Sequence, residues 1–503
     1  MESQRTENKS LAKNEIHVQF QEFGQKTRKG RLSERENQEC VVVIEQSSTV
    51  TAPTISYATG NKLASLDIQS DDSFMCQSME DKQFESEYIK NKLQFYPWYW
   101  GMILSTKMDN VLKWNNSFVV RRSIDRLQNK LFIITMKRNN IIEHYEICRK
   151  YQTWSVPKLL DENQHFYDIP ELINMLSKTL QGGTIPISRP PTIIYHDNIK
   201  MGKVLGKGAF GDVSQAIITL PGGEIRECAV KMIRGDSTRT QIAEFYQEVH
   251  IMELFDSPYV VKLYGTACLL TPVMVAMELL PGGSVWNYLR KNENVSHGKM
   301  FEMASDIAKG MAHLSDCQVI HRDLAARNCL LTADHRVKIS DFGLSVQATQ
   351  VIVKKLKQAP IRWLSPETLT KGIFNEKTDV WSYGVVLWEI FTKCANPPLH
   401  PKTQKESIVV IKEVENPHKL EDEKEVNEII AVCCKKNSSD RPNFEKIIKL
   451  WEPMLNNTKV LYKILKKPLP KDNCLSTEEK VEKTEKSKNT KGKKRSKFFS
   501  GRQ

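Results

Sequence analysis

The chain has 503 residues, 40% of them hydrophobic, and a formal net charge of +13, so it is long enough to bury more than one core. Its eleven cysteines show no zinc-ligand or disulfide spacing, which excludes a disulfide-framed secreted protein and suits a reducing cytosol. No apolar run could span a bilayer, no signal peptide is recognisable, and Glu2 excludes N-terminal myristoylation. We therefore expect a cytoplasmic protein.

Residues 1–92 form a region that we predict to be disordered. The region is polar and poor in aromatic residues, with clusters of Gln, Ser, Thr and Asn and no sustained hydrophobic periodicity. Such a composition buries too little apolar surface to offset the entropy of ordering the chain.

Residues 117–123, with the sequence SFVVRRS, carry the first candidate binding residues. On a strand, Arg121 and Ser123 share one face with Val119. An arginine that reaches inward is costly unless an anion meets it. A phosphate is a natural partner, because a guanidinium can hold it bidentately with help from Ser123. The alternative is a surface arginine on an edge strand.

Residues 97–183 resemble an SH2 domain, the family of modules that bind phosphotyrosine. The resemblance rests on the SFVVRRS string, on the tryptophan-rich start PWYWG at 97–101, and on two predicted strands, 131–136 and 142–147, followed by a helix near 169–178. It implies a central antiparallel sheet flanked by two helices, with His144 under the phosphotyrosine ring.

This module departs from the SH2 pattern at two positions. Ser105 stands where many SH2 domains have a second arginine at the start of the first helix, so we expect weak affinity for phosphotyrosine. Arg122 stands where the family usually has glutamate, and we expect it to face away from Arg121.

The linker, residues 184–197, separates this module from the next. It contains three prolines, a composition that fits either a short polyproline ligand or a plain spacer. We favour the spacer.

Residues 205–213 carry glycines with the spacing G-x-G-x-x-G-x-V. The string comprises Leu205, Gly206, Lys207, Gly208, Ala209, Phe210, Gly211, Asp212 and Val213. Glycines let the backbone close over a triphosphate and offer it N–H groups. Dinucleotide-binding folds follow a similar string with a helix, whereas residues 212–218 alternate like a strand and lead into a turn at 221–223. The sequence therefore predicts a strand–turn–strand hairpin.

Five further strings follow in order. They are CAVK at 228–231, HRDLAARN at 321–328, ISDFG at 339–343, SPE at 365–367 and DRP at 440–442. In the second, Asp323 can accept the proton of an incoming hydroxyl, and Asn328 can hold a metal ion that bridges nucleotide phosphates. Residues 198–455 thus resemble a protein kinase domain, and Ala325-Ala326-Arg327 is the form seen in kinases that phosphorylate tyrosine.

The resemblance implies a bilobal fold with ATP between the lobes, and it implies roles for the matched residues. Lys231 would pair with the α- and β-phosphates and with Glu248, which lies on the following predicted helix. Asp323 would take the proton of the substrate tyrosine, and Arg327 would help to position the acceptor.

Other matched residues would hold the metal and the adenine. Asn328 and Asp341 would bind Mg²⁺, or Mn²⁺ in its place. Met277 would be the gatekeeper, and Glu278 and Leu280 would meet adenine through backbone groups.

A structural ion pair follows from the same resemblance. In kinases the glutamate of the SPE-type string pairs with the arginine of the DRP string. We expect Glu367 and Arg441 to form such a pair, buried in the larger lobe.

The activation segment, residues 341–367, contains no tyrosine. Members of the family commonly phosphorylate a tyrosine there, and kinases with an arginine before the catalytic aspartate usually use it to grip the phosphate. Arg322 therefore has no obvious phosphate partner, and Ser345 and Thr349 are the only hydroxyl-bearing residues before Ser365. Two alternatives stay open: the segment orders without a phosphate, or another kinase modifies Thr349.

The order of the modules resembles the cytoplasmic SH2-containing tyrosine kinases, and most closely the Fes/Fer group. The string KQAPIRW at 357–363 and the short linker support this choice. Fes/Fer proteins carry a long membrane-bending and coiled-coil region that residues 1–92 do not match. A compact chain of this kind resembles the Fes/Fer-like set of nematodes.

Residues 466–503 form a basic tail that we also predict to be disordered. It holds thirteen Lys/Arg against five Asp/Glu, a net charge of +8, and its last basic run adjoins Phe498 and Phe499. Each basic residue near an anionic leaflet is worth about 1 kcal/mol, and buried phenylalanine adds to that. Peripheral attachment to the inner plasma membrane is one interpretation; a solvated tail or a nuclear-import-like string is the other.

The sequence therefore predicts an α+β chain in which an SH2 domain precedes a bilobal kinase domain. We expect a non-receptor tyrosine kinase that uses ATP and Mg²⁺, acts on protein tyrosines, docks to phosphotyrosine-containing proteins and binds no nucleic acid. The alternative is a signalling scaffold of the pseudokinase type. Its usual mark is a lost lysine, aspartate or asparagine, and none is lost here.

Overall fold

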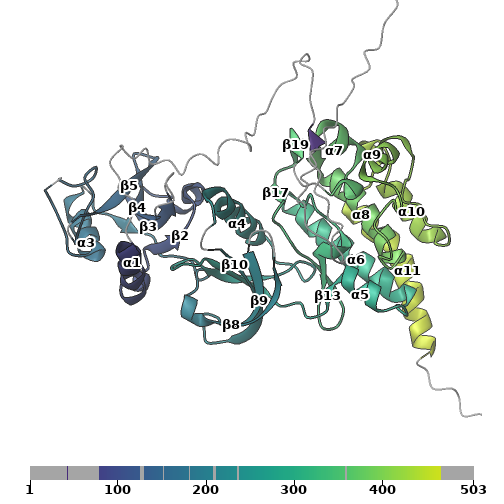
Figure 1. Cartoon of the computed structure of the whole chain (residues 1–503), viewed down its shortest axis with the longest axis horizontal. Coiled ribbons are helices and arrows are strands. Elements are labelled where there is room, and N and C mark those ends of the chain that lie inside the picture. Colours follow the sequence, from purple (N-terminus) through teal and green to yellow (C-terminus); the bar gives the residue numbers. More distant parts are fainter. Residues whose placement is uncertain are drawn as a thin grey trace, which may run out of the picture. The chain divides into compact units, whose positions relative to one another are not determined.

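A computed structural model of the chain (Figure 1) describes residues 42–43, 79–124, 130–150, 152–161, 163–180, 182–207, 211–234, 237–356 and 360–465. The basic tail, most of the region predicted to be disordered, and the tip of the glycine-rich string at 208–210 lie outside the described residues. Among the described helices, none combines the length and the apolar character that a bilayer crossing requires.

The N-terminal module is built on one twisted sheet. Its strands are β2 (Tyr99–Met102), β3 (Ser117–Ile124), β4 (Lys130–Arg138), β5 (Ile141–Lys150), β6 (Thr153–Ser155) and β7 (Ile185–Pro186). Strands β3 to β6 pair antiparallel in sequence order, while β2 and β7 lie parallel to β3. Every residue of β3 is buried, because other elements cover both faces of the sheet.

Helix α3 (Ile169–Thr179) packs on one face of this sheet. Its first turn is capped by Asp168, whose carboxylate accepts the N–H of Glu171 at 2.7 Å. Leu172 and Leu176 then join Phe132 in the module core. The two strands and the helix predicted from the sequence are confirmed. The first helical turns, η2 (Ser105–Lys107) and α2 (Met108–Val111), are short.

Helix α1 (Met79–Asn91) corrects the sequence prediction, which placed disorder up to residue 92. The helix has little amphipathic pattern of its own, so its order comes from tertiary contacts. Ile89 is fully buried, Glu85 forms an ion pair with Arg122 at 2.6 Å, and the ring of Tyr88 stacks on Trp154 at 5.6 Å. A short turn, η1 (Leu93–Phe95), connects α1 to the sheet.

A five-stranded antiparallel sheet and one helix make up the small lobe of the kinase region (Figure 1). The elements are η3 (His196–Asn198), β8 (Ile199–Lys207), β9 (Gly211–Thr219), β10 (Ile225–Ile233), α4 (Arg239–Met252), β11 (Leu263–Ala267) and β12 (Met274–Glu278). The antiparallel hairpin of β9 and β10, which turns at residues 221–223, confirms the predicted strand–turn–strand arrangement. Phe245 and Val249 of α4 pack with Val275 of the sheet.

Helices form most of the large lobe (Figure 1). They are α5 (Val285–Lys291), α6 (His297–Asp316), α7 (Pro366–Lys371), α8 (Glu376–Phe391), α9 (Gln404–Glu413), α10 (Lys424–Cys433) and α11 (Phe444–Leu465), with 3-10 turns η4 (Ala326–Asn328), η5 (Ile361–Trp363) and η6 (Ser438–Asp440). Helix α8 is buried along nearly its whole length. Its Tyr383 hydroxyl accepts from Nε1 of Trp451 at 2.7 Å and donates to the carbonyl of Ala304 at 2.9 Å.

Short strand pairs hold the loops of the large lobe. These are β13 (Gly283–Ser284) with β15 (Cys329–Leu331) and β16 (Val337–Ile339), β14 (Val319–Ile320) with β17 (Val346–Gln347), β18 (Gln350–Ile352) with β20 (Ile373–Asn375), and β1 (Val42–Val43) with β19 (Lys355–Leu356). The loop between β14 and β15 contains Asp323. The segment after β16 contains Asp341.

Candidate active site

The glycine-rich string lies at the turn between β8 and β9. Leu205, Gly206 and Lys207 end β8, and Gly211, Asp212 and Val213 begin β9, whereas Gly208, Ala209 and Phe210 lie outside the described residues. Gly211 approaches β10 so closely that a Cβ there would lie 2.0 Å from the carbonyl oxygen of Met232. A side chain at Gly211 would therefore require the backbone of β9 or β10 to shift.

Lys231 and Glu248 form the ion pair that the sequence predicted. Nζ of Lys231 in β10 lies 2.7 Å and 2.5 Å from the two carboxylate oxygens of Glu248 in α4. Burial raises the pKa of Glu248, and the nearby Lys231 opposes that rise. The pair fixes α4 against the sheet and holds the ammonium group where a phosphate could meet it.

The segment predicted to meet adenine follows the last strand of the small lobe. Met277 and Glu278 end β12, and Leu280 comes just after it, largely buried in the core. The side chain of Glu278 is engaged by Nζ of Lys338 at 2.7 Å, and its backbone N–H donates to the carbonyl of Lys262 at 2.8 Å. A nucleotide would therefore have to use the carbonyl of Glu278.

The catalytic loop holds the Asp323 carboxylate between two partners. One oxygen accepts a hydrogen bond from Nη2 of Arg327, and the other accepts from Nδ2 of Asn328 at 2.8 Å. Burial raises the pKa of Asp323 to about 6, although Arg327 opposes the rise. A carboxyl group of this kind can take a proton near neutral pH and is oriented to do so.

The side chain of His321 fixes the catalytic loop through two hydrogen bonds. Its Nδ1 accepts the backbone N–H of Asp323 at 3.2 Å, so its Nε2 carries the proton and donates to the carbonyl of Ser340 at 3.2 Å. Burial lowers the pKa of His321, which keeps the ring neutral. Asp379 of α8 accepts the backbone N–H groups of His321 and Arg322 at 2.7 Å and 3.0 Å.

The metal-binding residues predicted from the sequence lie on the two strings that flank β15 and β16. Asp341 is exposed with a left-handed φ of 63°, while the next residue, Phe342, is buried against the ring of His321 at 5.6 Å. Nδ2 of Asn328 is engaged by Asp323, so the amide oxygen is the donor left for a metal. One carboxylate and one amide oxygen suit Mg²⁺, which takes its other ligands from water and nucleotide phosphates. The described residues contain no cluster of three or more His, Cys, Asp or Glu that would hold a metal by themselves.

Glu389 is a site residue that the sequence analysis missed. This fully buried carboxylate of α8 accepts the backbone N–H of Ala326 at 2.9 Å and Nε1 of Trp363 at 3.0 Å. It thereby joins the catalytic loop to the segment that ends in α7, and the guanidinium of Arg327 lies 4.9 Å over the ring of Trp363. No motif singled out Glu389, because its partners are distant in the sequence.

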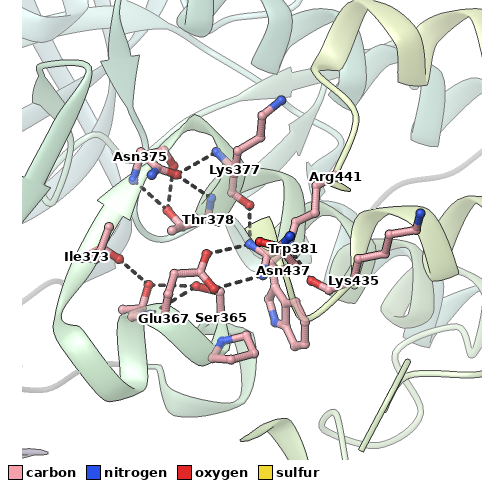
Figure 2. Close-up of polar contacts among 12 residues, drawn as sticks. Ser365, Glu367, Ile373, Asn375, Lys377, Thr378, Trp381, Lys435, Asn437 and Arg441 are labelled. Carbon is pink, nitrogen blue, oxygen red and sulfur yellow. Dashed lines mark hydrogen bonds and ion pairs between the residues drawn. The ribbon is translucent and has the colours of Figure 1, made fainter. Parts of the chain in front are cut away.

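Glu367 and Arg441 form the predicted ion pair (Figure 2). Nη1 and Nη2 of Arg441 lie 2.6 Å and 2.9 Å from the two oxygens of Glu367, and the side chain of Arg441 is fully buried. Arg441 also donates to the carbonyls of Lys377 and Lys435. The guanidinium therefore ties the start of α7 to the loop before α11.

Two of the predicted binding residues of the N-terminal module, Arg121 and His144, share the hydroxyl of Thr135 as a partner. Nε of Arg121 donates to Oγ1 of Thr135 at 2.8 Å, and Nη1 donates to the carbonyl of Ile103 at 3.2 Å. Among the described residues no carboxylate pairs with Arg121, and burial lowers its pKa to about 10. Nδ1 of His144 lies 3.1 Å from the same Thr135 hydroxyl, and Ser123 is buried on the same strand. Thr135 was not predicted from the sequence.

The two positions that depart from the SH2 pattern are both buried. Ser105 begins the turn η2. Arg122 points to the opposite face from Arg121, as expected, and is neutralised by Glu85 while its guanidinium lies 4.9 Å over the ring of Phe132.

The N-terminal module contacts α4 and the residue that follows β11 through hydrogen bonds and one ion pair. The hydroxyl of Tyr246 donates to the carbonyl of Met102, whose N–H donates to the carbonyl of Cys268 at 2.8 Å. Nζ of Lys107 lies 2.7 Å from the carboxylate of Glu253 at the end of α4. The helix that carries Glu248 is thus packed between the sheet of the small lobe and this module.

Comparison with known proteins agrees with this geometry. Residues 199–450 match the family of protein tyrosine and serine/threonine kinases. The chain belongs to this kinase family. It is 35% identical over 375 residues to Fer-related kinase 1 of Caenorhabditis elegans, which covers 72% of this chain and 94% of that protein. The predicted α+β bilobal kinase region and the likeness to the Fes/Fer group are confirmed.

Two further relatives are longer. The chain is 30% identical over 365 residues to tyrosine-protein kinase Fer of Rattus norvegicus, covering 70% of this chain and 43% of Fer. It is 29% identical over 365 residues to the transforming protein Fps of avian sarcoma virus, covering 69% of this chain and 65% of Fps. The chain therefore spans less than half the length of Fer. Members of the family use ATP and a divalent metal ion, which the residues around Asp323 fit.

Proposed function

We propose that this kinase transfers the γ-phosphate of ATP to tyrosine residues of proteins, with Mg²⁺ as the metal. The observation that carries the proposal is the Asp323 carboxylate, held by Arg327 and Asn328 and poised by burial to accept a proton. Lys231, supported by Glu248, would hold the nucleotide phosphates. Asn328 and Asp341 would hold the metal, which supplies charge stabilisation when it is bound.

Tyrosine is the favoured acceptor for two reasons. The string Ala325-Ala326-Arg327 is the form seen in kinases that phosphorylate tyrosine, and Arg327 is held in place by Asp323 and by the ring of Trp363. Fer and Fps, which resemble this chain, are both named tyrosine-protein kinases. The scaffold alternative has no observation in its favour, because the lysine, aspartates and asparagine of the site are all present.

The direct test uses purified full-length chain with ATP, Mg²⁺ and a poly-Glu-Tyr polymer. Asp323→Asn removes the proton acceptor with little change in shape, and Lys231→Met removes the phosphate contact. Each should lower turnover roughly a hundredfold or more. Wild-type turnover in Asp323→Asn would reject the enzyme assignment.

We also propose that residues 97–183 are an SH2 domain that binds phosphotyrosine through Arg121, Ser123 and His144. The support is a buried arginine whose described partners are a hydroxyl and a carbonyl, not a carboxylate. A buried cation of this kind is stabilised by an arriving dianion. A fluorescent phosphotyrosine peptide should bind the wild type and lose most of its affinity for Arg121→Lys, which keeps the charge but not the bidentate geometry. Equal affinity in both would contradict the site.

The location and the membrane contact are proposals as well. We propose a cytoplasmic protein whose basic tail, residues 466–503, meets anionic membrane surfaces. The support is the net charge of +8 beside two phenylalanines. Sedimentation with phosphatidylserine vesicles should recover the full chain, and a chain ending at Lys466 should stay in solution. Equal recovery of both would leave the tail as a solvated extension.

A further inference from the structure

Arg322 lies between the catalytic loop and the activation segment. Its guanidinium lies 4.6 Å over the centroid of the Phe374 ring, and Nη1 donates to the carbonyl of Leu344 at 3.1 Å. Burial lowers the pKa of Arg322, so its charge is poorly solvated. The negative face of an aromatic ring attracts such a cation most strongly when water is excluded.

Phe374 connects this arginine to the middle of the activation segment. Its side chain is buried, and in β20 it pairs directly with Val351 of β18. The N–H of Val353 donates to the carbonyl of Gly372 at 2.9 Å, which extends the pairing by one residue. The centre of the activation segment is therefore joined by backbone bonds to the strand that carries Phe374.

The first part of the activation segment is held in a similar way. Strand β17 pairs with β14, and the N–H of Ala348 donates to the carbonyl of Gln318 at 2.8 Å. Residues 346–353 are thus anchored to the large lobe before and after the turn at Thr349. The anchors are backbone hydrogen bonds and one aromatic ring, and a phosphatase can remove neither.

Two of the three hydroxyl-bearing residues of the activation segment are buried and so are not accessible to another kinase. Ser345 is 5% exposed and donates to the carbonyl of His321 at 3.2 Å, and Ser365 is 1% exposed and caps α7. Thr349 is exposed at the turn between β17 and β18. Only Thr349 is open to modification without unfolding of the segment.

We propose that Phe374 is a positioning residue whose ring holds Arg322 and thereby keeps the activation segment in its substrate-accepting arrangement without any phosphate. The inference rests on the kinase activity proposed above and concerns the regulation of that site. Arg322 directly precedes Asp323, and Asp379 fixes its backbone. A shift of the Arg322 side chain is thus transmitted on one side to the catalytic base and on the other to β18.

The test compares Phe374→Leu, which keeps an apolar side chain but removes the ring, with Ile352→Ala. Ile352 lies on the paired strand β18 but is 57% exposed, so its loss should leave turnover unchanged. All full-length variants are first treated with a phosphatase that acts on Ser, Thr and Tyr. The wild type should then phosphorylate poly-Glu-Tyr linearly from mixing, without a lag. Phe374→Leu should lower kcat about tenfold or more, with the KM for ATP little changed, because small misplacement at a reaction centre is costly.

Two further measurements separate positioning from general destabilisation. Arg322→Gln should lower turnover about as much as Phe374→Leu. The double variant should turn over no more slowly than the less active of the two single variants, because both changes break one contact. Amide hydrogen exchange at residues 350–353 should accelerate in Phe374→Leu while the strands of the small lobe keep their protection.

Opposite results would overturn the inference. Phe374→Leu with the turnover and exchange of Ile352→Ala would show that the ring positions nothing. A wild-type lag that ends only as Thr349 becomes phosphorylated, together with a Thr349→Ala variant that stays slow, would show that a phosphate is needed. If the wild type labels no tyrosine at all, the proposed function fails, and the exchange data still decide whether Phe374 orders β18.

Discussion

Glu389 accepts hydrogen bonds from Nε1 of Trp363 at 3.0 Å and from the backbone N–H of Ala326 at 2.9 Å. One buried carboxylate thus bridges the catalytic loop and the segment that leads into α7. Glu389→Gln can keep an oxygen for both donors, whereas Glu389→Leu leaves two buried N–H groups without a partner. Each orphaned donor costs about 1–3 kcal/mol, so urea unfolding should show Glu389→Leu as clearly less stable than Glu389→Gln.

Wild type and Glu389→Gln should also differ in how their stability depends on pH. Burial raises the pKa of Glu389 from 4.5 to about 7, so at intermediate pH the folded protein holds a proton that the unfolded chain releases. This contribution to stability is complete below pH 4.5 and is lost as the pH rises through about 7. The stability of wild type relative to Glu389→Gln should therefore fall over this range. A constant difference would place the titration elsewhere.

Asp323 should control the acid limb of the kinase pH profile. Burial raises its pKa to about 6, and only the unprotonated carboxylate can accept the substrate proton. At saturating ATP and peptide, kcat should rise as the pH increases through about 6 and then level off. A kcat that stays constant well below pH 6 would show that Asp323 does not act as the base.

Acceptor choice should favour tyrosine over serine by orders of magnitude. The string Ala325-Ala326-Arg327 is the form seen in kinases that phosphorylate tyrosine, whereas serine kinases usually place lysine two residues after the catalytic aspartate. A peptide array with matched Tyr and Ser members, incubated with ATP and Mg²⁺, measures the ratio. Labelling mainly on serine would be the contrary result, and Asp323→Asn provides the background.

Breaking the buried Glu367–Arg441 pair should destabilise the large lobe strongly. Glu367→Gln leaves the guanidinium of Arg441 without its counter-charge, and such losses cost roughly 3–5 kcal/mol. Denaturant unfolding followed by tryptophan fluorescence measures the change. The double variant Glu367→Met, Arg441→Leu is the control, because it removes both charges and should recover part of the loss. A single variant as stable as wild type would contradict this account.

Phosphotyrosine at Arg121 should raise kinase turnover by favouring the present position of α4. The N-terminal module contacts that helix through Tyr246 and Met102 and through Lys107 and Glu253. A ligand shifts a population only by its differential affinity for the two states. A tight phosphopeptide should raise the turnover of wild type above its value without peptide. Arg121→Ala should turn over more slowly than wild type and should not respond to the peptide.

Two variants separate this coupling from other effects. Tyr246→Phe removes the hydroxyl that reaches Met102 but leaves Arg121 intact, so it should bind the peptide normally and respond less. A chain ending at Lys466 tests whether the basic tail contributes in solution, where we expect no effect. If wild type, Arg121→Ala and the shortened chain all turn over alike in both conditions, the module does not regulate the kinase.

Much of the site could be predicted from the sequence because its chemistry lies in short contiguous strings. The string HRDLAARN, by its resemblance to the catalytic loop of protein kinases, placed Asp323 and Asn328 on one loop, and strand alternation placed Arg121 and Ser123 on one face of a strand. The pairing of Lys231 with Glu248, and of Glu367 with Arg441, followed from resemblance to kinases. The residue types and spacing within each string are visible in the sequence, whereas the pairings between strings came from the resemblance.

Other features were decided only by the tertiary structure. Helix α1 has too weak an amphipathic pattern to be predicted, and its order comes from the contact of Glu85 with Arg122 and of Tyr88 with Trp154. Arg322 had no visible partner in the sequence, yet folding places Phe374 beneath it. Glu389 joins the catalytic loop to the segment before α7 because the fold brings Ala326 and Trp363 to its carboxylate. Burial and contacts between residues that are distant in the sequence determine these features, and neither can be inferred from the order of neighbouring residues.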